Sequence, residues 1–465
     1  IALAGYGYIV ASVARRGAGA SFGVRRGYQD RNEANDHYEV VEWLARQDWS
    51  NGRIGMIGCS NTGDAVMQTL TMLPPSLRAA FAGCFSWNKY DGFGRGGGIR
   101  ANWGTGPTRT IEEEMRNIPV QGDEARILLR QAAEEHQLNT NLADLLRGMP
   151  NRDTHSPLTH SRFWYEGSAS SYVHQLRRSN VALYIQGGWF DDFRREGLVT
   201  FANMPNTPRV IIGPWAHCNN DDFNMVAEMV RFFDHHLKEI DTGIAADDAI
   251  HYFTINAPQG QEWRATPVWP LAQTLSRTQR GRSASFQVRY DVSCENGDLS
   301  PTQIQPCHVP GSGLAFPGAV LTRDTEITGH PIVNLWIRAS APNVRVFAYL
   351  EDVAPDGTTF VVTEGRLNAA QRQRHTPPYD YLGLPWMRAH AEDAAALTPG
   401  AAAELVFDML PASYVFKAGH RIQITITGSD FRERDRPEAE TPPTITVLNE
   451  GRYRSSVTLP FIPNP

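Results

Sequence analysis

The chain has 465 residues, with 44 Lys and Arg against 50 Asp and Glu, so its formal charge is −6 and its pI is near 6.2. At about 100 to 200 residues per domain, this length predicts two or three folded units. The acidic balance argues against nucleic acid or an anionic membrane as a partner, because no surplus of positive charge can neutralise phosphates. Since no run of about 18 apolar residues occurs, we expect no membrane-spanning helix.

The first part of the chain alternates between apolar runs and helical patterns. Tyr8–Val13 is an apolar run before a glycine-rich loop and predicts a buried strand. Asp36 is the expected N-cap of a helix, residues 53–57 predict a short strand, and Ala65–Leu73 resumes helical spacing. This alternation is typical of a parallel, doubly wound sheet.

The middle of the chain changes character and then returns to strands. Residues 110–147 are rich in Glu, Arg, Leu and Ala and predict helices. Strand patterns return at Val181–Ile185 and Arg209–Ile212, each followed by small or glycine residues. We therefore expect an α/β core made of residues 1–87 and 179–243, with residues 88–178 inserted as a helical cap.

The remaining part, residues 244–465, is expected to be an all-β sandwich. Alternating segments such as Val333–Ile337 and Arg421–Ile426 are separated by Pro, Gly and Asp, and convincing helical patterns are few. Ala394–Ala403 is alanine-rich and predicts a loop or linker.

Ser60 is the candidate nucleophile, in the segment Gly58-Cys59-Ser60-Asn61-Thr62-Gly63 between a predicted strand and a predicted helix. A serine needs a base to take its proton and a position that substrate can reach. The two glycines would allow a tight turn, and the start of the helix would place N–H groups near a developing oxyanion. The spacing G-x-S-x-x-G differs from the usual G-x-S-x-G, so a serine in a helix-capping turn is the competing interpretation.

Candidate partners follow Ser60 in the order acid, then histidine, that an α/β-hydrolase requires. Asp191 comes just after one predicted strand, although Asp192 is equally plausible on spacing alone, and a helix N-cap is the structural alternative. His217 follows the next strand, after Gly213-Pro214-Trp215-Ala216. We find no metal-ligand cluster in the sequence, and expect neither a metal nor another cofactor.

Five cysteines are scattered without the paired C-x-x-C spacing of a zinc site. Cys59 and Cys218 flank two candidate catalytic residues, and we expect their small side chains to serve in packing rather than as redox partners. Cys294 and Cys307 could form a local disulfide if the protein is exported. The compartment and the oligomeric state stay open.

Several short motifs occur in a fixed order over nearly the whole chain. They are Arg16–Ser21, Glu42–Leu44, Trp49–Arg53, Gly58–Gly63, Gly188–Asp191, Gly213–His217, Val353–Gly357 and Ala418–Ile422. Together they resemble the CocE/NonD hydrolases, a group that contains cocaine esterase, α-amino acid ester hydrolases, glutaryl acylases and Xaa-Pro dipeptidyl-peptidases.

This resemblance implies an α/β-hydrolase core with a helical cap insertion, followed by a C-terminal β jelly-roll sandwich. It favours Asp191 over Asp192 as the acid, and it implies the backbone N–H of Asn61 as one oxyanion donor. The residue at Asn61 is usually Tyr in the family. The second oxyanion donor is a tyrosine on a segment that would precede the first strand, so we expect a missing N-terminal piece.

The expected function is a serine hydrolase that cleaves small carboxylic esters through an acyl-enzyme intermediate. An amide or peptide hydrolase is the alternative; a dipeptidyl-peptidase would need a clamp for an amino group, for which Glu112–Glu114 is a candidate against a solvated helix face. A binding protein with a decayed hydrolase core is a further alternative. Trp87, Trp189 and Trp215 are candidate walls of the substrate pocket, with buried packing as the default for tryptophan.

Overall fold

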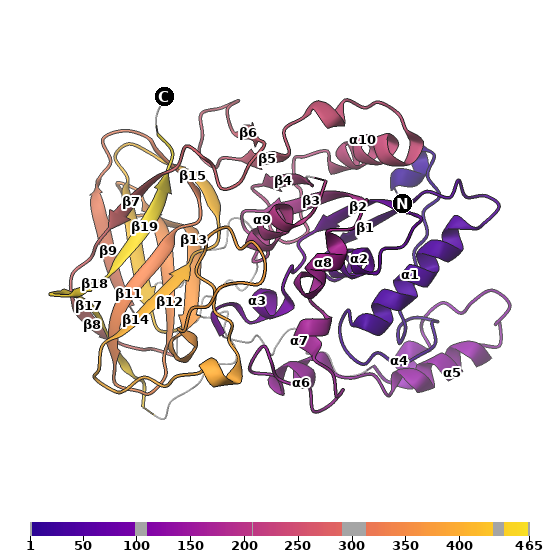
Figure 1. The fold of residues 1–465 in the computed structure, drawn as a ribbon, viewed down its shortest axis with the longest axis horizontal. Helices are drawn as coiled ribbons and strands as arrows, with labels where there is room; N and C mark the ends of the chain where they lie inside the picture. Colours follow the sequence, from indigo (N-terminus) through magenta and orange to yellow (C-terminus); the bar gives the residue numbers. More distant parts are fainter. Residues whose placement is uncertain (1, 98–108, 207, 291–312, 431–440, 464–465) are drawn as a thin grey trace.

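The computed structural model describes residues 2–97, 109–206, 208–290, 313–430 and 441–463. The chain forms an α/β unit and an all-β unit that lie side by side, with the N-terminal end in the first and the C-terminal end in the second (Figure 1). Among these residues, no helix combines the length and apolar character needed to cross a bilayer.

The α/β unit is built on a six-stranded sheet in the order β1-β2-β3-β4-β5-β6. Strands β1 to β5 are parallel and β6 is antiparallel to β5. Their bounds are β1 (Ile54–Cys59), β2 (Leu77–Gly83), β3 (Ala182–Gly188), β4 (Arg209–Gly213), β5 (Ile250–Phe253) and β6 (Trp263–Thr266). The predicted parallel core is confirmed, but its sheet runs beyond residue 243. A short alternating strand such as β5 does not show in its own residues which sheet it will join.

Helices cover both faces of this sheet, as a doubly wound fold requires. On one face, side chains such as Ala80 pack with Val66 of α2 (Asn61–Met72) and Leu198 of α9 (Arg194–Asn203). On the other face, Phe81 packs with Phe232 of α10 (Met225–Lys238). Neighbouring residues of β2 therefore enter separate cores, because side chains alternate along a strand.

Two predictions for the N-terminal segment are wrong. Tyr8–Val13 forms no strand, and Ile9 and Val13 are 66% and 59% exposed. The first long helix, α1 (Arg31–Ala45), begins before Asp36, because Asp30 caps it by accepting hydrogen bonds from the backbone of residues 32 and 33. A short apolar run predicts a strand reliably only when a neighbouring strand is known to pair with it. An aspartate predicts an N-cap reliably only when the start of the helix is known.

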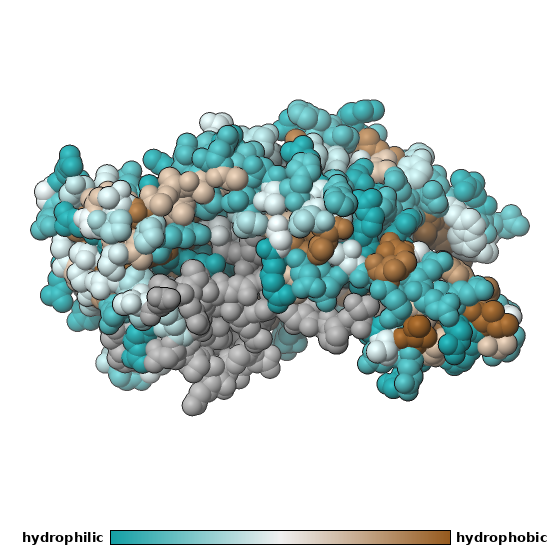
Figure 2. Space-filling model, turned by 90° about the horizontal axis from the view of Figure 1, so that it is seen from below, coloured by the Kyte–Doolittle hydropathy of each residue, from teal (hydrophilic) through white to brown (hydrophobic). Residues whose placement is uncertain are grey.

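Short helices follow β2 and lie below the sheet in Figure 1, in the part of the chain expected to form the cap. They are α3 (Lys89–Phe93), α4 (Ile111–Glu114), α5 (Ile127–His136), α6 (Leu142–Arg147), α7 (Phe163–Glu166) and α8 (Val173–Leu176). Single 3₁₀ turns are η1 (Ala2–Tyr6), η2 (Arg95–Gly97), η3 (Ala169–Tyr172) and η4 (Ile244–Ala246). Figure 2 shows apolar side chains on this underside chiefly at the α/β end. Exposed apolar residues in this part of the chain include Ile118, Ile127 and Leu138.

The all-β unit is a sandwich of a nine-stranded and a four-stranded sheet, as expected. The larger sheet runs β15-β10-β19-β11-β17-β18 with β14, β7 and β8 attached, and the smaller runs β13-β12-β16-β9. Buried side chains of both sheets, such as Ile337 and Ile424, share one core. The bounds are β7 (Leu275–Gln279), β8 (Ala284–Gln287), β9 (Gly313–Val320), β10 (Thr325–Gly329), β11 (Ile332–Ala339), β12 (Arg345–Val353), β13 (Thr359–Asn368), β14 (Ala403–Asp408), β15 (Ala412–Phe416), β16 (Arg421–Thr427), β17 (Thr444–Glu450), β18 (Tyr453–Arg454) and β19 (Ser456–Phe461), with η5 (Ala369–Gln371) and η6 (Ala391–Asp393). Of the predicted loop Ala394–Ala403, residues 394–402 connect η6 to β14, and Ala403 is the first residue of that strand.

The start of α9 joins the two units. Arg194 donates hydrogen bonds to the carbonyl of Pro411 at 2.9 Å and the hydroxyl of Thr363 at 2.9 Å, both in the sandwich. It also donates to the backbone carbonyl of Asp191 at 3.1 Å. Buried Arg195 pairs with Asp408 at 3.1 Å. The sandwich thus supports the loop that carries the candidate catalytic acid.

Candidate active site

Ser60 is the single residue between the end of β1 and the start of α2. Its backbone has φ 59° and ψ −124°, which is a strained conformation for a residue with a side chain. Although Ser60 occupies the N-cap position of α2, its side chain makes no capping hydrogen bond. The hydroxyl is therefore not used as a helix cap, and the turn has the strained strand-to-helix form of a nucleophile elbow.

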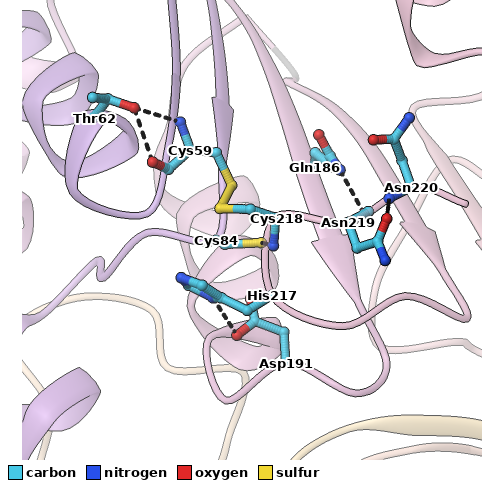
Figure 3. The surroundings of a disulfide bond; sticks show 9 residues. All are labelled: Cys59, Thr62, Cys84, Gln186, Asp191, His217, Cys218, Asn219 and Asn220. Atoms are coloured by element: carbon cyan, nitrogen blue, oxygen red, sulfur yellow. Dashed lines mark hydrogen bonds and ion pairs between the residues drawn. A yellow bond between two sulfur atoms is a disulfide. The ribbon is translucent and has the colours of Figure 1, made fainter. Parts of the chain in front are cut away.

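Two glycines make this turn possible. A Cβ atom on Gly58 would collide with the backbone of Thr62, and one on Gly63 would lie 2.5 Å from the carbonyl oxygen of Gly83. The Thr62 hydroxyl bonds both the N–H and the carbonyl of Cys59 at 2.9 Å, as Figure 3 shows. The irregular spacing of the motif therefore places a glycine at each of the two positions where nearby backbone leaves no room for a side chain.

Asp191 and His217 lie on the loops that follow β3 and β4, at the carboxyl end of the sheet. His217 Nδ1 lies 2.9 Å from Asp191 Oδ1 (Figure 3). Asp191 is 3% exposed, while about a quarter (26%) of the His217 side chain is exposed. Because adjacent parallel strands end at the same edge of a sheet, Asp191 and His217, which are 26 positions apart in sequence, meet at the carboxyl edge at which β1 also ends.

The electrostatic environment favours the charged form of His217. Burial alone lowers the pKa of His217, but the hydrogen bond to Asp191 and its negative charge outweigh burial, so the pKa lies above its usual value of 6.5. The charges of Asp192 and Asp64 act in the same direction. A histidine that takes a proton from an attacking serine is stabilised by this arrangement.

Cys59 and Cys218 form a disulfide, which corrects the expectation that they serve only in packing. Their Cα atoms are 5.9 Å apart although 159 positions separate them in the chain. Ser60 and His217 are the residues next to the two cysteines. Since consecutive Cα atoms are about 3.8 Å apart, the Cα atoms of Ser60 and His217 lie no more than about 13.5 Å from one another. The other predicted pair, Cys294 and Cys307, lies outside the described residues.

The disulfide was missed because its pairing depends on how the segment that follows β4 folds back over the edge of the sheet to the end of β1. A usable signal was present, since each cysteine directly adjoins a candidate catalytic residue at the carboxyl end of a predicted parallel strand. Residues at such ends meet at one edge. Cys84, which follows β2, is also at this edge and is the one unpaired cysteine in the described part of the chain.

Asn61, the predicted oxyanion donor, is the first residue of α2. The first N–H groups of a helix lack intrahelical acceptors and lie at the positive end of the helix dipole. The side chain and carbonyl of Asn61 both accept hydrogen bonds from the buried Gln29 amide. Asn61 is thus held from one side while its N–H lies at the helix start beside Ser60.

The three candidate pocket tryptophans are buried in the core. Trp87 packs edge-on against Tyr379, Trp189 donates to the carbonyl of Phe253, and Trp215 is only 2% exposed. These surroundings favour packing over a role as pocket walls. Of the candidate amino clamp, Glu112 and Glu113 are exposed, whereas Glu114 is buried and accepts a hydrogen bond from Asn117.

Sequence reasoning missed the buried pair of Asp64 and Lys89. Asp64 accepts hydrogen bonds from the backbone N–H and hydroxyl of Ser86, and Lys89 Nζ lies 3.8 Å from its carboxylate. Burial raises the pKa of Asp64 and lowers that of Lys89. Lys89 also donates to the carbonyl of Tyr28 at 2.7 Å. A lysine with no exposed side-chain surface has no local signal in its sequence.

Two groups of potential metal ligands occur in the described part of the chain: Cys59, Cys84 and Cys218, and Cys84, Asp191 and His217. In the first group two sulfurs are bonded to one another. In the second, a metal would compete with the hydrogen bond between Asp191 and His217. The arrangement therefore suits acid–base chemistry at His217.

Comparisons with known proteins assign the family. Residues 2–219 match the model of the X-Pro dipeptidyl-peptidase (S15 family), and residues 251–458 match the X-Pro dipeptidyl-peptidase C-terminal non-catalytic domain. The chain is 30% identical over 533 aligned positions to a protein of Mycobacterium bovis named as a serine esterase, with 98% of this chain and 83% of that protein covered. It is 25% identical to the cocaine esterase of a Rhodococcus species, with 92% and 82% covered.

Solved structures show the same fold. A CocE/NonD family hydrolase from Staphylococcus aureus is similar with a TM-score of 0.72 and 17% identity, covering 97% of this chain and 79% of that one. An α-amino acid ester hydrolase is similar with a TM-score of 0.66 and 17% identity, covering 96% and 84%. With its catalytic and C-terminal domains both matched, the chain belongs to the CocE/NonD group of X-Pro dipeptidyl-peptidase-like (S15) proteins and is a serine hydrolase.

Proposed function

We propose that the protein cleaves small carboxylic esters, with Ser60, His217 and Asp191 as its catalytic triad. The observation that carries this proposal is the strained turn at Ser60, whose hydroxyl makes no capping bond and whose neighbour Cys59 is joined covalently to the neighbour of His217. A purely structural serine would have no need of this conformation.

The geometry supports a two-step mechanism. When His217 Nδ1 donates its proton to Asp191, the second ring nitrogen, Nε2, carries the lone pair that can accept the Ser60 proton. The Ser60 oxygen attacks the carbonyl carbon, and the backbone N–H of Asn61 stabilises the oxyanion. His217 then protonates the leaving alkoxide, and a water activated by the same histidine releases the acid.

Esters are the favoured substrate because the two relatives compared above are named as esterases and because an alkoxide leaves more readily than an amine. The second candidate is cleavage after an Xaa-Pro dipeptide, which the S15 family match favours. A free amino group would need an acidic partner, and Glu112–Glu114 offers two exposed carboxylates and one engaged with Asn117. None of these contacts favours that segment as the clamp.

The test compares p-nitrophenyl acetate and butyrate with Xaa-Pro p-nitroanilides, using the parent and the Ser60→Ala variant. We expect ester turnover in the parent and a loss of at least about 10⁴-fold in Ser60→Ala, because the covalent step cannot form. Ser276→Ala, an exposed serine in β7, is the matched control and should retain full turnover. Labelling by a fluorophosphonate probe should require Ser60, and a Ser60→Ala protein that still turns over esters would contradict the assignment.

A further inference from the structure

Three sulfur atoms gather at the edge of the sheet, directly beside the triad. The sulfurs of Cys59, Cys84 and Cys218, here called the sulfur cluster, all lie within 4.8 Å of one another. One atom each from Cys84, Asp191 and His217 likewise lies within 4.8 Å of the others. Figure 3 shows Cys84 between the disulfide and the Asp191–His217 pair.

The disulfide spans strands that are not neighbours. β1, which leads to Ser60, and β4, which leads to His217, are separated in the sheet by β2 and β3. At about 4.8 Å per strand, their axes lie about 14 Å apart. The Cα atoms of Cys59 and Cys218 nevertheless approach to 5.9 Å. Cys59 is the last residue of β1 and pairs with Gly83 of β2, so the segment that follows β4 must fold back across the ends of β3 and β2 to reach it, and the disulfide is the covalent bond that joins the two.

The end of β2 is shaped to allow this crossing. A Cβ atom on Gly83 would lie only 3.2 Å from the sulfur of Cys59, so the glycine leaves room for the disulfide. Ser60 is tied to the same place, since its N–H donates to the carbonyl of Gly83 at 2.9 Å. The position of the nucleophile and the position of the disulfide are thus set by one residue of β2.

Cys84 connects the disulfide to the catalytic acid. Its sulfur accepts a hydrogen bond from the backbone N–H of Cys218 at 3.2 Å. Burial raises the pKa of the Cys84 thiol, and the adjacent charge of Asp191 and a hydrogen bond to it act in the same direction, so the sulfur keeps its proton. A protonated thiol can donate to the carboxylate that holds His217.

The backbone at Cys84 and Cys218 is strained. Cys84 has φ 50° and Cys218 has φ 58°, conformations that residues with side chains rarely adopt. Such conformations persist where surrounding contacts outweigh their cost. At Cys218 these contacts are the disulfide and the hydrogen bond to Cys84; on the following residue, the Asn219 carbonyl accepts a hydrogen bond from Gln186 at 3.1 Å (Figure 3).

We propose that the sulfur cluster positions the triad, so that turnover depends on the Cys59–Cys218 disulfide being intact. This inference rests on the proposed function of Ser60, Asp191 and His217. The disulfide holds the His217 loop over the Ser60 turn, and the Cys84 thiol supports both the loop and Asp191. These cysteines are positioning residues, because they act through the triad and not on substrate.

The disulfide is open to chemical reduction, since Cys218 is exposed and Cys59 is half-buried. A thiolate of an added dithiol attacks the Cys218 sulfur, forms a mixed disulfide, and releases Cys59 as a thiolate that takes up a proton. The second thiol of the reductant then displaces Cys218, and the reductant leaves as a cyclic disulfide. Two electrons and two protons are thereby transferred to Cys59 and Cys218.

The experiment measures ester hydrolysis by the full chain before and after treatment with dithiothreitol. Mass spectrometry after iodoacetamide labelling verifies that Cys59 and Cys218 have been freed. We expect kcat to fall about 10- to 100-fold, as for a misplacement of catalytic groups near 1 Å, while KM changes less than about twofold. Reoxidation should restore kcat.

Matched variants separate positioning from general stability. Cys59→Ser/Cys218→Ser should have the kcat of the reduced parent and be insensitive to dithiothreitol. Cys294→Ser/Cys307→Ser should respond like the parent. Cys84→Ala should lower kcat, whereas Cys84→Ser, which keeps a donor and an acceptor, should restore most of it.

Two readouts distinguish failure of this inference from failure of the proposed function. Fluorophosphonate labelling reports the nucleophile, and hydrogen–deuterium exchange of residues 214–220 reports the position of the His217 loop. If the oxidised parent is not labelled but exchange of residues 214–220 becomes faster on reduction, the proposed esterase function is rejected, while the inference that the disulfide positions the His217 loop is supported. A verified reduced enzyme with kcat within twofold of the parent and unchanged exchange would overturn the inference, even if the serine variants fail to fold.

Discussion

Replacing Asp191 with asparagine tests the triad most directly. The carboxylate lies 2.9 Å from His217 Nδ1 and is buried, so the hydrogen bond between them is charge-assisted once the histidine is protonated. Such bonds contribute about 1.5 to 3 kcal/mol, which is about 10- to 150-fold in rate. An asparagine that donates its amide to Nδ1 would also place the histidine proton on Nε2, where it blocks acceptance from Ser60. This tautomer effect brings the expected loss toward about 10⁴-fold in kcat.

The pH dependence of Asp191→Asn gives an independent check. His217 must be neutral to accept a proton, so kcat/KM rises with pH as the imidazole loses its proton and levels off above its pKa. In the parent we expect this acid limb above pH 6.5, because the hydrogen bond and charge of Asp191 raise the pKa of His217 against the effect of burial. The variant loses both contributions while burial remains, so the limb should move to lower pH.

The neighbouring Asp192 is the matched control. Its charge also raises the pKa of His217, but the hydrogen bond to Nδ1 comes from Asp191. Asp192→Asn should therefore shift the acid limb slightly and lower kcat by no more than a few-fold. Ester hydrolysis is followed from pH 5 to 9 with circular dichroism to confirm folding. The reasoning would be refuted if Asp191→Asn stayed within tenfold of the parent, or if Asp192→Asn caused the larger loss.

Three further predictions concern the scaffold. Gly63→Ala should lower the free energy of unfolding by about 1 to 3 kcal/mol and reduce kcat/KM, because the new Cβ would lie 2.5 Å from the Gly83 carbonyl oxygen. The control is Gly5→Ala, which has open space around it and should change neither thermal unfolding nor turnover. Lys89→Ala should destabilise the protein by about 3 to 5 kcal/mol, because it leaves the buried carboxylate of Asp64 without its cation. Lys417→Ala, which removes the exposed Lys417–Asp324 pair, should destabilise it by no more than about 1 kcal/mol. Equal losses of stability in thermal unfolding would contradict this. Reduction of the Cys59–Cys218 disulfide should lower the midpoint of thermal unfolding. A disulfide that closes a loop of 159 residues stabilises the folded state by about 5 kcal/mol in the chain-entropy limit, and about 2 to 4 kcal/mol is typical. An unchanged midpoint would contradict this prediction.

Local signals predicted much of the site. The two glycines around Ser60 reflect collisions with the segment's own backbone and with the next strand, so the turn is visible in the sequence itself. Asp191 and His217 were proposed because each follows a predicted buried strand, and the structure places them 2.9 Å apart where β3 and β4 end at one edge. The choice of Asp191 over Asp192 came only from the family resemblance, because two adjacent residues on a loop cannot be distinguished by spacing.

Apart from the N-cap of α1, the predictions that failed were those that needed a long-range partner. The apolar run at Tyr8–Val13 looks like a strand, but no strand in the described part of the chain pairs with it, and Ile9, Val10 and Val13 are exposed. β5 and β6 have the alternation of the sandwich strands, yet they pair with the hydrolase sheet. Alternation shows that a strand has two different faces and says nothing of its neighbour.

The sequence by itself determined the type of each unit, the turn at Ser60 and the chain order of the three proposed triad residues, because these depend on periodicity and on backbone conformations that only nearby residues control. Only the tertiary structure decided that Cys59 and Cys218 are bonded and that Cys84 lies between their disulfide and Asp191. The reason is physical: a contact between residues 159 positions apart exists only after four strands have assembled and their loops have bent over a common edge.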